Sequence, residues 1–244
     1  AANRVTGPCD QILAPYGGVI TMYYDGTSTR WRIEYNSFNV AAMQIAGMLG
    51  HYYTASAGAT VAGDWGDLNL VTSGGANGQV APTSTLPGAW EINTSTSATG
   101  MASLAYSDGV VNPVEIGSAH IVASCAVYFP TLSDGTQTYT FQMGIIPSPT
   151  STTLNVNNSV GIRYTNGTNS GKWQGFSRDN AGSESTADLG TTVATNTNYV
   201  LTVRINKARD EAYFYINGAY AGRVTGNMPS ATDAGMRVGI FKSV

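Results

Sequence analysis

Carboxylates are the first residues to examine for catalysis, because a glycosidase places two of them about 5 to 9.5 Å apart across a sugar linkage. The glutamates available are Glu34, Glu91, Glu115, Glu184 and Glu211. Glu184 alone has a carboxylate partner at strand spacing, Asp188, and both lie in a Ser, Thr and Ala-rich stretch that favours a loop. Asp210 and Glu211 are adjacent, so on a strand they face opposite ways. We therefore expect no glycosidase centre.

A polysaccharide lyase needs His, Tyr, Gln and Arg side chains that converge on one site. His120, Arg163, Tyr164 and Gln174 would form such a set if their strands were neighbours, which the sequence does not establish. The sequence lacks a Gly-x-Ser-x-Gly elbow and a Gly-x-x-x-x-Gly-Lys-Ser/Thr phosphate loop. We expect a non-catalytic protein, with lyase or hydrolase activity left open.

Residues 163–179 hold the side chains that sugar binding requires. An aromatic ring packs against the apolar face of a sugar, and amide, guanidinium and carboxylate groups bond its hydroxyls. The predicted ligand-binding residues are therefore Tyr164, Asn166, Trp173, Gln174, Arg178 and Asp179. A Trp on a central strand also suits the core of a sandwich, so both interpretations of Trp173 stay open. Tyr213 and Tyr215 alternate with apolar residues and offer a second patch, for a ligand or for a subunit.

Composition indicates the elements that must position these residues. Charged residues make up 11% of the 244 residues, against about 25% in an ordinary protein, while 29 residues are Gly and Thr, Ser and Asn abound. That mixture favours strands and turns over long helices. Strand-like runs separated by turn signals recur from Gly88 to Val244 and predict an antiparallel β-sandwich. The best hairpin signal is Asn217-Gly218, since a type I′ turn needs positive φ at both positions.

Three zones follow from this pattern. Residues 1–36 form a neck whose centre, Gly18 to Tyr35, predicts a β-hairpin with its turn at Asp25-Gly26. Residues 37–87 predict a short helix at Val40 to Leu49 and then a Gly, Ala and Thr-rich spacer read as loops. Residues 88–244 form the sandwich.

Charge and cysteine usage exclude several classes of function. The net charge is −3 and no Lys/Arg run is present, so we expect no nucleic-acid partner. No stretch is apolar enough for membrane insertion and no secretory leader is visible, and we read the chain as a fragment or processed product. Cys9 and Cys125 lack metal-ligand spacing and are expected to stay unpaired, with Cys125 a small buried hydrophobe.

The run from Tyr199 to Asn206, followed by Phe214-Tyr-Ile-Asn-Gly218 and Gly239-Ile-Phe-Lys-Ser243, resembles the concanavalin A-like (laminin-G-like) jelly-roll modules. It is most similar to those at the ends of bacteriophage tail fibres and other virion structural proteins. The hairpin Gly18 to Tyr35 likewise resembles a segment of phage fibre chains near a trimeric neck. The resemblance covers about two thirds of the chain and implies a jelly-roll fold, while one fold hosts many activities.

The resemblance also implies an assembly. A lone hairpin buries too little to be stable, so its apolar side chains are expected to pack against partner chains. The predicted interface of a homotrimer comprises Tyr23, Trp31, Ile33 and Tyr35. The other expected partners are virion proteins and a host surface glycan, and the expected location is the virion, assembled in the cytoplasm of a bacterial host. No cofactor is predicted, although laminin-G-like folds often carry Ca²⁺ and Asp179-Asn180 and Asp108 with Asn112 offer oxygen ligands.

The favoured function is thus a phage tail-fibre or tail-tip protein that binds host surface glycan without catalysis. A structural capsid or tail decoration protein that binds only virion subunits is the alternative. A capsular polysaccharide depolymerase is a third hypothesis.

Overall fold

A computed structural model of the chain describes residues 11–14, 18–25, 30–37, 68–73, 75–80, 89–95, 100–106, 114–117, 120–134, 138–147, 154–230 and 233–242. The chain forms two compact units, Ala1–Tyr52 and Tyr53–Val244. Among the described residues, no helix is long and apolar enough to cross a membrane.

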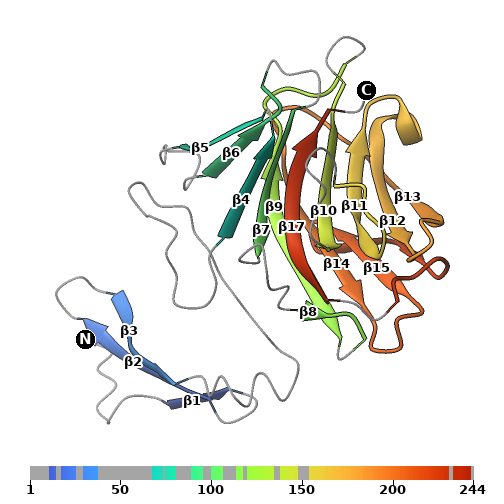
Figure 1. Cartoon of the computed structure of the whole chain (residues 1–244). Helices are drawn as coiled ribbons and strands as arrows, with labels where there is room; N and C mark the ends of the chain where they lie inside the picture. Colours follow the sequence, from blue (N-terminus) through green and yellow to red (C-terminus); the bar gives the residue numbers. More distant parts are fainter. Residues whose placement is uncertain are drawn as a thin grey trace. The chain divides into compact units, whose positions relative to one another are not determined.

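The first unit contains a three-stranded antiparallel sheet in the order β1-β2-β3, drawn in blue in Figure 1. Its strands are β1 (Gln11–Ala14), β2 (Gly18–Asp25) and β3 (Arg30–Ser37). Asp25 pairs with Arg30, so the predicted hairpin is confirmed, with β1 added at one edge. The side chains of the predicted interface residues Tyr23, Trp31, Ile33 and Tyr35 lie outside the described part, as do the expected helix at Val40 to Leu49 and Cys9.

The second unit is built on two antiparallel sheets that form a sandwich (Figure 1), which confirms the predicted fold class. The larger, eight-stranded sheet has the order β13-β12-β11-β10-β17-β7-β4, with β8 paired to β17. Its strands are β4 (Leu68–Ser73), β7 (Met101–Tyr106), β8 (Val114–Glu115), β10 (Thr140–Ile146), β11 (Ser159–Thr165), β12 (Lys172–Arg178), β13 (Glu184–Thr192) and β17 (Asp233–Phe241).

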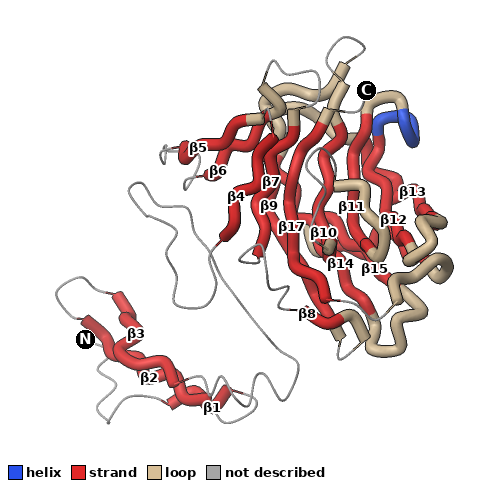
Figure 2. Tube along the Cα trace, in the orientation of Figure 1, coloured by secondary structure: helices blue, strands red, loops and turns tan. Residues whose placement is uncertain are grey.

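The smaller, four-stranded sheet has the order β16-β15-β14-β9. Its strands are β9 (Ile121–Tyr128), β14 (Asn198–Ile205), β15 (Ala212–Ile216) and β16 (Ala219–Val224). A separate pair joins β5 (Ala76–Val80) to β6 (Ala89–Asn93). Figure 2 shows how strands dominate this unit, with the 3-10 helix η1 (Thr168–Gly171) as the one helical segment of the described residues.

The core lies between the two sheets and is centred on Trp173, which has no exposed surface. Four aromatic rings surround the indole with centroids 5.4 to 6.2 Å away, those of Phe129, Phe141, Tyr164 and Tyr199. Leu201, Val203 and Ile205 on β14 are fully buried as their alternation predicts. Close packing extends to the backbone: a Cβ on Gly175 would lie 2.4 Å from the ring of Phe214.

The turn at Asn217-Gly218 also forms as predicted, with φ of 52° and 79° at the two residues. Cys125 is half-buried against the core, and desolvation raises the pKa of its thiol to about 12. Cys125 forms no disulfide within the described part of the chain.

Two segments expected to be loops are strands. The stretch from Glu184 to Asp188, read as a polar loop, belongs to β13, an edge strand of the larger sheet whose one buried side chain is Leu189. Residues 68–80, assigned to the spacer, contain β4 and β5, and β4 completes the far edge of the larger sheet against β7. Edge strands carry a weaker hydrophobic pattern than central ones, which explains both errors.

Candidate functional site

The outer face of the larger sheet, the side turned away from the core, carries most of its polar side chains. On β10 the side chains of Phe141, Met143 and Ile145 enter the core, so the alternating residues Thr140 and Gln142 lie on the outer face. Pairing extends this alternation to β11 and β12, where Gln142 stands opposite Arg163 and Arg163 opposite Gln174. Strand periodicity thus gathers polar groups from several strands in one row.

A hollow of about 220 Å³ opens on this face, and we call it the Arg163 hollow. Its lining combines three threonine hydroxyls, two carboxamide side chains, one guanidinium and one aromatic ring. These belong to Thr140, Gln142, Asn155, Arg163, Thr165, Thr168 and Phe241. The β10 and β11 residues form one side, Asn155 comes from the segment after Leu154, and Thr168 comes from η1.

Neighbouring contacts fix the lining in place. The hydroxyls of Thr140 and Thr165 lie 2.9 Å apart on paired strands. Gln142 donates from Nε2 to the carbonyl of Leu154 at 3.3 Å, and Leu154 packs with Met101 and Phe241 in a small second cluster. The segment that carries Asn155 is thereby held against the sheet.

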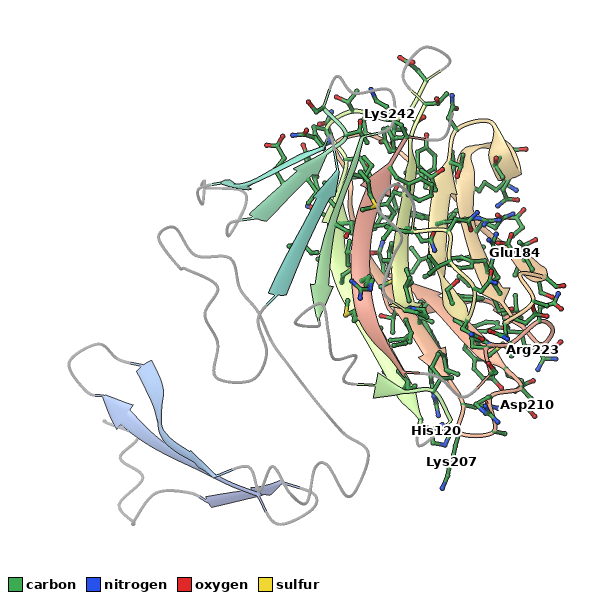
Figure 3. The ribbon with its side chains drawn as sticks, in the orientation of Figure 1. His120, Glu184, Lys207, Asp210, Arg223 and Lys242 are labelled. Atoms are coloured by element: carbon green, nitrogen blue, oxygen red, sulfur yellow. The ribbon has the colours of Figure 1, made fainter. Side chains whose placement is uncertain are left out.

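Behind the hollow, Glu184 joins two arginines. Arg163 forms a forked pair with this carboxylate, at 2.9 Å from Nη1 and 2.6 Å from Nη2, and Arg178 donates from Nη2 at 2.8 Å (Figure 3 labels Glu184). Burial alone would raise the pKa of Glu184, but the hydrogen bonds from Arg163 and Arg178 outweigh it and hold the pKa below its usual value. The carboxylate is therefore ionised near neutral pH and cannot serve as a proton donor.

Arg163 is fixed by further contacts. Its Nε donates to Oε1 of Gln174 at 2.8 Å, and its guanidinium lies 5.3 Å above the ring of Phe176. The Phe176 ring in turn covers Gly161, where a Cβ would come within 2.8 Å of it. A planar guanidinium held by a carboxylate, an amide and an aromatic face keeps one orientation.

The two carboxylates of β13 do not form a catalytic pair. Glu184 and Asp188 are four residues apart on one strand, about 13 Å at the usual rise, beyond the separation of either glycosidase geometry. Asp188 accepts from Gly190 N at 2.7 Å, from Lys172 Nζ at 2.9 Å and from Asn169 at 3.2 Å. The Gly190 and Lys172 bonds hold the pKa of Asp188 below its usual value.

The lyase set does not assemble either. Arg163 and Gln174 meet on the outer face, but Tyr164 points into the core with 3% of its surface exposed. His120 precedes β9 in the other sheet, and Figure 3 places it at the end of the sandwich that also carries Lys207 and Asp210. The four residues therefore share no site.

The predicted sugar-binding residues divide into three groups. Tyr164 and Trp173 are core residues, 3% and 0% exposed, so the expectation that either ring stacks on a sugar is wrong. Gln174 and Arg178 lie on the outer face and take part in the Arg163 and Glu184 network. Asn166 and Asp179 lie at opposite ends of the hairpin. Asn166 is exposed after β11, and Asp179 accepts from Ser183 N at 2.9 Å in the β12–β13 turn.

Sequence reasoning missed the residues that complete the hollow, Thr140, Gln142, Asn155, Thr165, Thr168 and Phe241. A signal was available for part of the set: in a strand, adjacent residues face opposite ways. That rule separates Arg163 from Tyr164 and Gln174 from Trp173, and it turns the two aromatic rings towards the core. Within the described residues, no group of three or more His, Cys, Asp or Glu side chains could hold a metal ion.

Comparison with known proteins gives similarity of fold. No protein-family model matches the sequence, and no curated protein matches it significantly. Among solved structures, it is similar to an endo-β-1,4-glucuronan lyase from the fungus Trichoderma reesei, at 12% identity, with 75% of this chain and 81% of that chain covered and a TM-score of 0.49.

Two other similar structures differ in activity. A carbohydrate binding module from Bacillus subtilis is 13% identical, with 72% of this chain and 92% of that chain covered and a TM-score of 0.42. A β-glucanase from Bacillus licheniformis is 14% identical, with 80% and 82% covered and a TM-score of 0.39. The similar structures thus include both carbohydrate-binding and glycan-active domains, and the activity must be argued from the site.

Proposed function

We propose that the sandwich is a glycan-binding module and that its ligand occupies the Arg163 hollow without being cleaved. The observation that carries this proposal is the lining itself. Hydroxyl, carboxamide and guanidinium groups converge there beside the Phe241 ring, and these are the groups that bond sugar hydroxyls and contact an apolar sugar face.

The placement of carboxylates favours binding over hydrolysis. Among the described residues no Asp or Glu lines the hollow, and Glu184 is neutralised by two arginines. A hydrolase needs one carboxyl that holds a proton and a second carboxylate at a fixed separation. Neither requirement is met on the described part of this face.

We propose further that the glycan belongs to a host cell surface and that the chain is a phage tail-fibre or tail-tip protein, placed in the virion as a homotrimer. The support is the resemblance of the Gly18 to Tyr35 hairpin and of the sandwich strands to phage fibre chains. Three copies would bind a repetitive surface with far higher avidity than one hollow provides.

A structural role in a virion is the second candidate, and the smaller sheet favours it. The described large hydrophobic side chains that remain exposed are Val122, Tyr128, Val200 and Tyr220, and all four belong to this sheet. Tyr220 forms an edge-to-face pair with Tyr215 at 6.0 Å. Such a face suits a subunit contact.

A glycan array with the purified protein, combined with its mass from light scattering, tests these proposals together. The matched variants are Thr168→Val, which removes an exposed hydroxyl from the hollow, and Thr202→Val, which removes one from the smaller sheet. Loss of one hydrogen bond should weaken binding about three- to tenfold in Thr168→Val and leave Thr202→Val unchanged. Equal losses would refute the site, absence of any glycan binding would favour the structural role, and a monomer would refute the homotrimer.

A further inference from the structure

We propose that the Arg163 hollow selects an acidic glycan, one whose sugar residue carries a carboxylate as a uronic or sialic acid does. This inference rests on the proposed glycan-binding function. The inference adds the chemical class of the glycan to that proposed function.

The first argument is the charge of the lining. Arg163 is the one charged side chain among the residues that line the hollow, and its side chain is 17% exposed. No described carboxylate shares the lining, and the nearby Glu184 is paired with both Arg163 and Arg178. An ionised carboxylate gains more from a guanidinium than a neutral sugar hydroxyl does.

The second argument is the number of donors left over. A guanidinium has five N–H groups, and the described hydrogen bonds of Arg163 use one at Nε, one at Nη1 and one at Nη2. Two N–H groups of Arg163 therefore remain for a ligand. The pairing with Glu184 orients the guanidinium and leaves these donors in place.

Arg178 adds a second positive charge next to the hollow. Its Nε is buried and has no hydrogen-bond partner. Its Nη1 lies 3.4 Å from the carbonyl of Asn155, a long contact to a residue of the lining. Arg178 therefore contributes its positive charge next to the lining, while its Nε stays inside the protein.

The net charge of the face points the same way. The ion-paired cluster at the hollow consists of Arg163, Arg178 and Glu184, two cations minus one anion, or +1. The whole chain has a formal net charge of −3. A locally cationic patch on an acidic protein steers an anionic ligand to this face and away from the rest.

The size of the hollow limits what the anion can be. At about 220 Å³ it is smaller than the roughly 300 to 1,000 Å³ of sites for drug-sized ligands. A hollow of this size suits one sugar residue of a longer chain, with the hydroxyls of Thr140, Thr165 and Thr168 beside the guanidinium.

The test is an array that presents uronate- and sialate-containing oligosaccharides beside neutral counterparts of the same linkage, followed by titration of each bound pair. We expect the acidic member to bind at least tenfold more tightly, with a preference that falls as NaCl rises from 50 to 500 mM. Preferential binding of neutral glycans, or equal binding of both members, would overturn the inference while leaving glycan binding intact. Absence of binding to either member would contradict the proposed function itself.

A matched pair of variants tests whether Arg163 determines the preference for acidic glycans. Arg163→Lys keeps the charge but loses the planar guanidinium and its two remaining N–H donors, so the ratio of acidic to neutral affinity should fall at least threefold. Arg204→Lys makes the same change on exposed Arg204 of the smaller sheet and should keep the wild-type ratio. The near-ultraviolet circular dichroism of the aromatic core reports whether Arg163→Lys is folded. An unchanged ratio in the folded variant would overturn the assignment to Arg163.

Discussion

Replacement of Trp173 by alanine tests whether this residue belongs to the core or stacks on a ligand. The indole is fully buried, and four aromatic rings lie with centroids 5.4 to 6.2 Å from it. Truncation of a buried Trp costs about 3 to 5 kcal/mol, and edge-to-face contacts of this kind place the loss near the upper end. For a domain of this size the midpoint of thermal unfolding should drop by about 8 to 20 °C.

Trp173→Phe provides the graded comparison. Its ring keeps most of the aromatic contacts and removes the indole Nε1, which is buried without a hydrogen-bond partner. The loss should therefore be smaller, about 1 to 2 kcal/mol. Urea unfolding followed by far-ultraviolet circular dichroism measures both variants, since that signal does not depend on the tryptophan removed.

Glycan affinity measured at a temperature where both variants are folded completes the test. Because the indole faces the core, we expect native affinity in folded Trp173→Phe. A loss of stability below about 1 kcal/mol in Trp173→Ala would refute the core assignment. So would a loss of glycan binding in a variant whose stability is unchanged.

Three other predictions concern individual residues. Gly175→Ala should destabilise the fold by about 1 to 3 kcal/mol in urea unfolding, because its Cβ would lie 2.4 Å from the Phe214 ring; native stability would contradict that close approach. The pKa of Glu184 lies below its ordinary 4.5, so its ion pairs stabilise the fold above about pH 4.5, and this contribution is lost as pH falls through the lowered folded-state pKa. Glu184→Gln should therefore lower the free energy of unfolding at pH 7 and reduce the difference in that free energy between pH 7 and pH 3. An unchanged pH profile of stability in the variant would argue against the ion pairs. The thiol of Cys125, with its pKa raised to about 12, should resist iodoacetamide at pH 8 in the folded protein and react in urea; rapid labelling of the folded chain would contradict its burial.

The fold class was predictable because period-2 alternation and turn chemistry are local signals. Leu201, Val203 and Ile205 identified a half-buried strand, and Asn217-Gly218 identified a type I′ turn. Edge strand β13 was not predicted, because its side chains are mostly Ser, Thr, Ala and Asp and only Leu189 is buried. This segment is a strand because it pairs with β12, and the sequence gives no local signal of that pairing.

The candidate site was predictable only in part, because it is assembled across strands. Gln174 and Arg178 lie on the outer face but do not line the hollow, and Tyr164 and Trp173 were assigned to the ligand although alternation turns them towards the core. Thr140 and Phe241 reach the hollow through the β10–β17 pairing, in which they stand opposite each other although about a hundred residues separate them in sequence. Register between distant strands is set by packing and cannot be read from local patterns.

The most direct test of the central claim is a titration of the side-chain amide resonances by NMR, with the glycan that the array identifies. Gln142 and Asn155 line the Arg163 hollow, whereas Asn217 lies in the β15–β16 turn of the smaller sheet. A ligand in the hollow should shift the Gln142 and Asn155 amides in step with saturation and leave Asn217 unchanged. A shift confined to Asn217 and the smaller sheet would contradict the account.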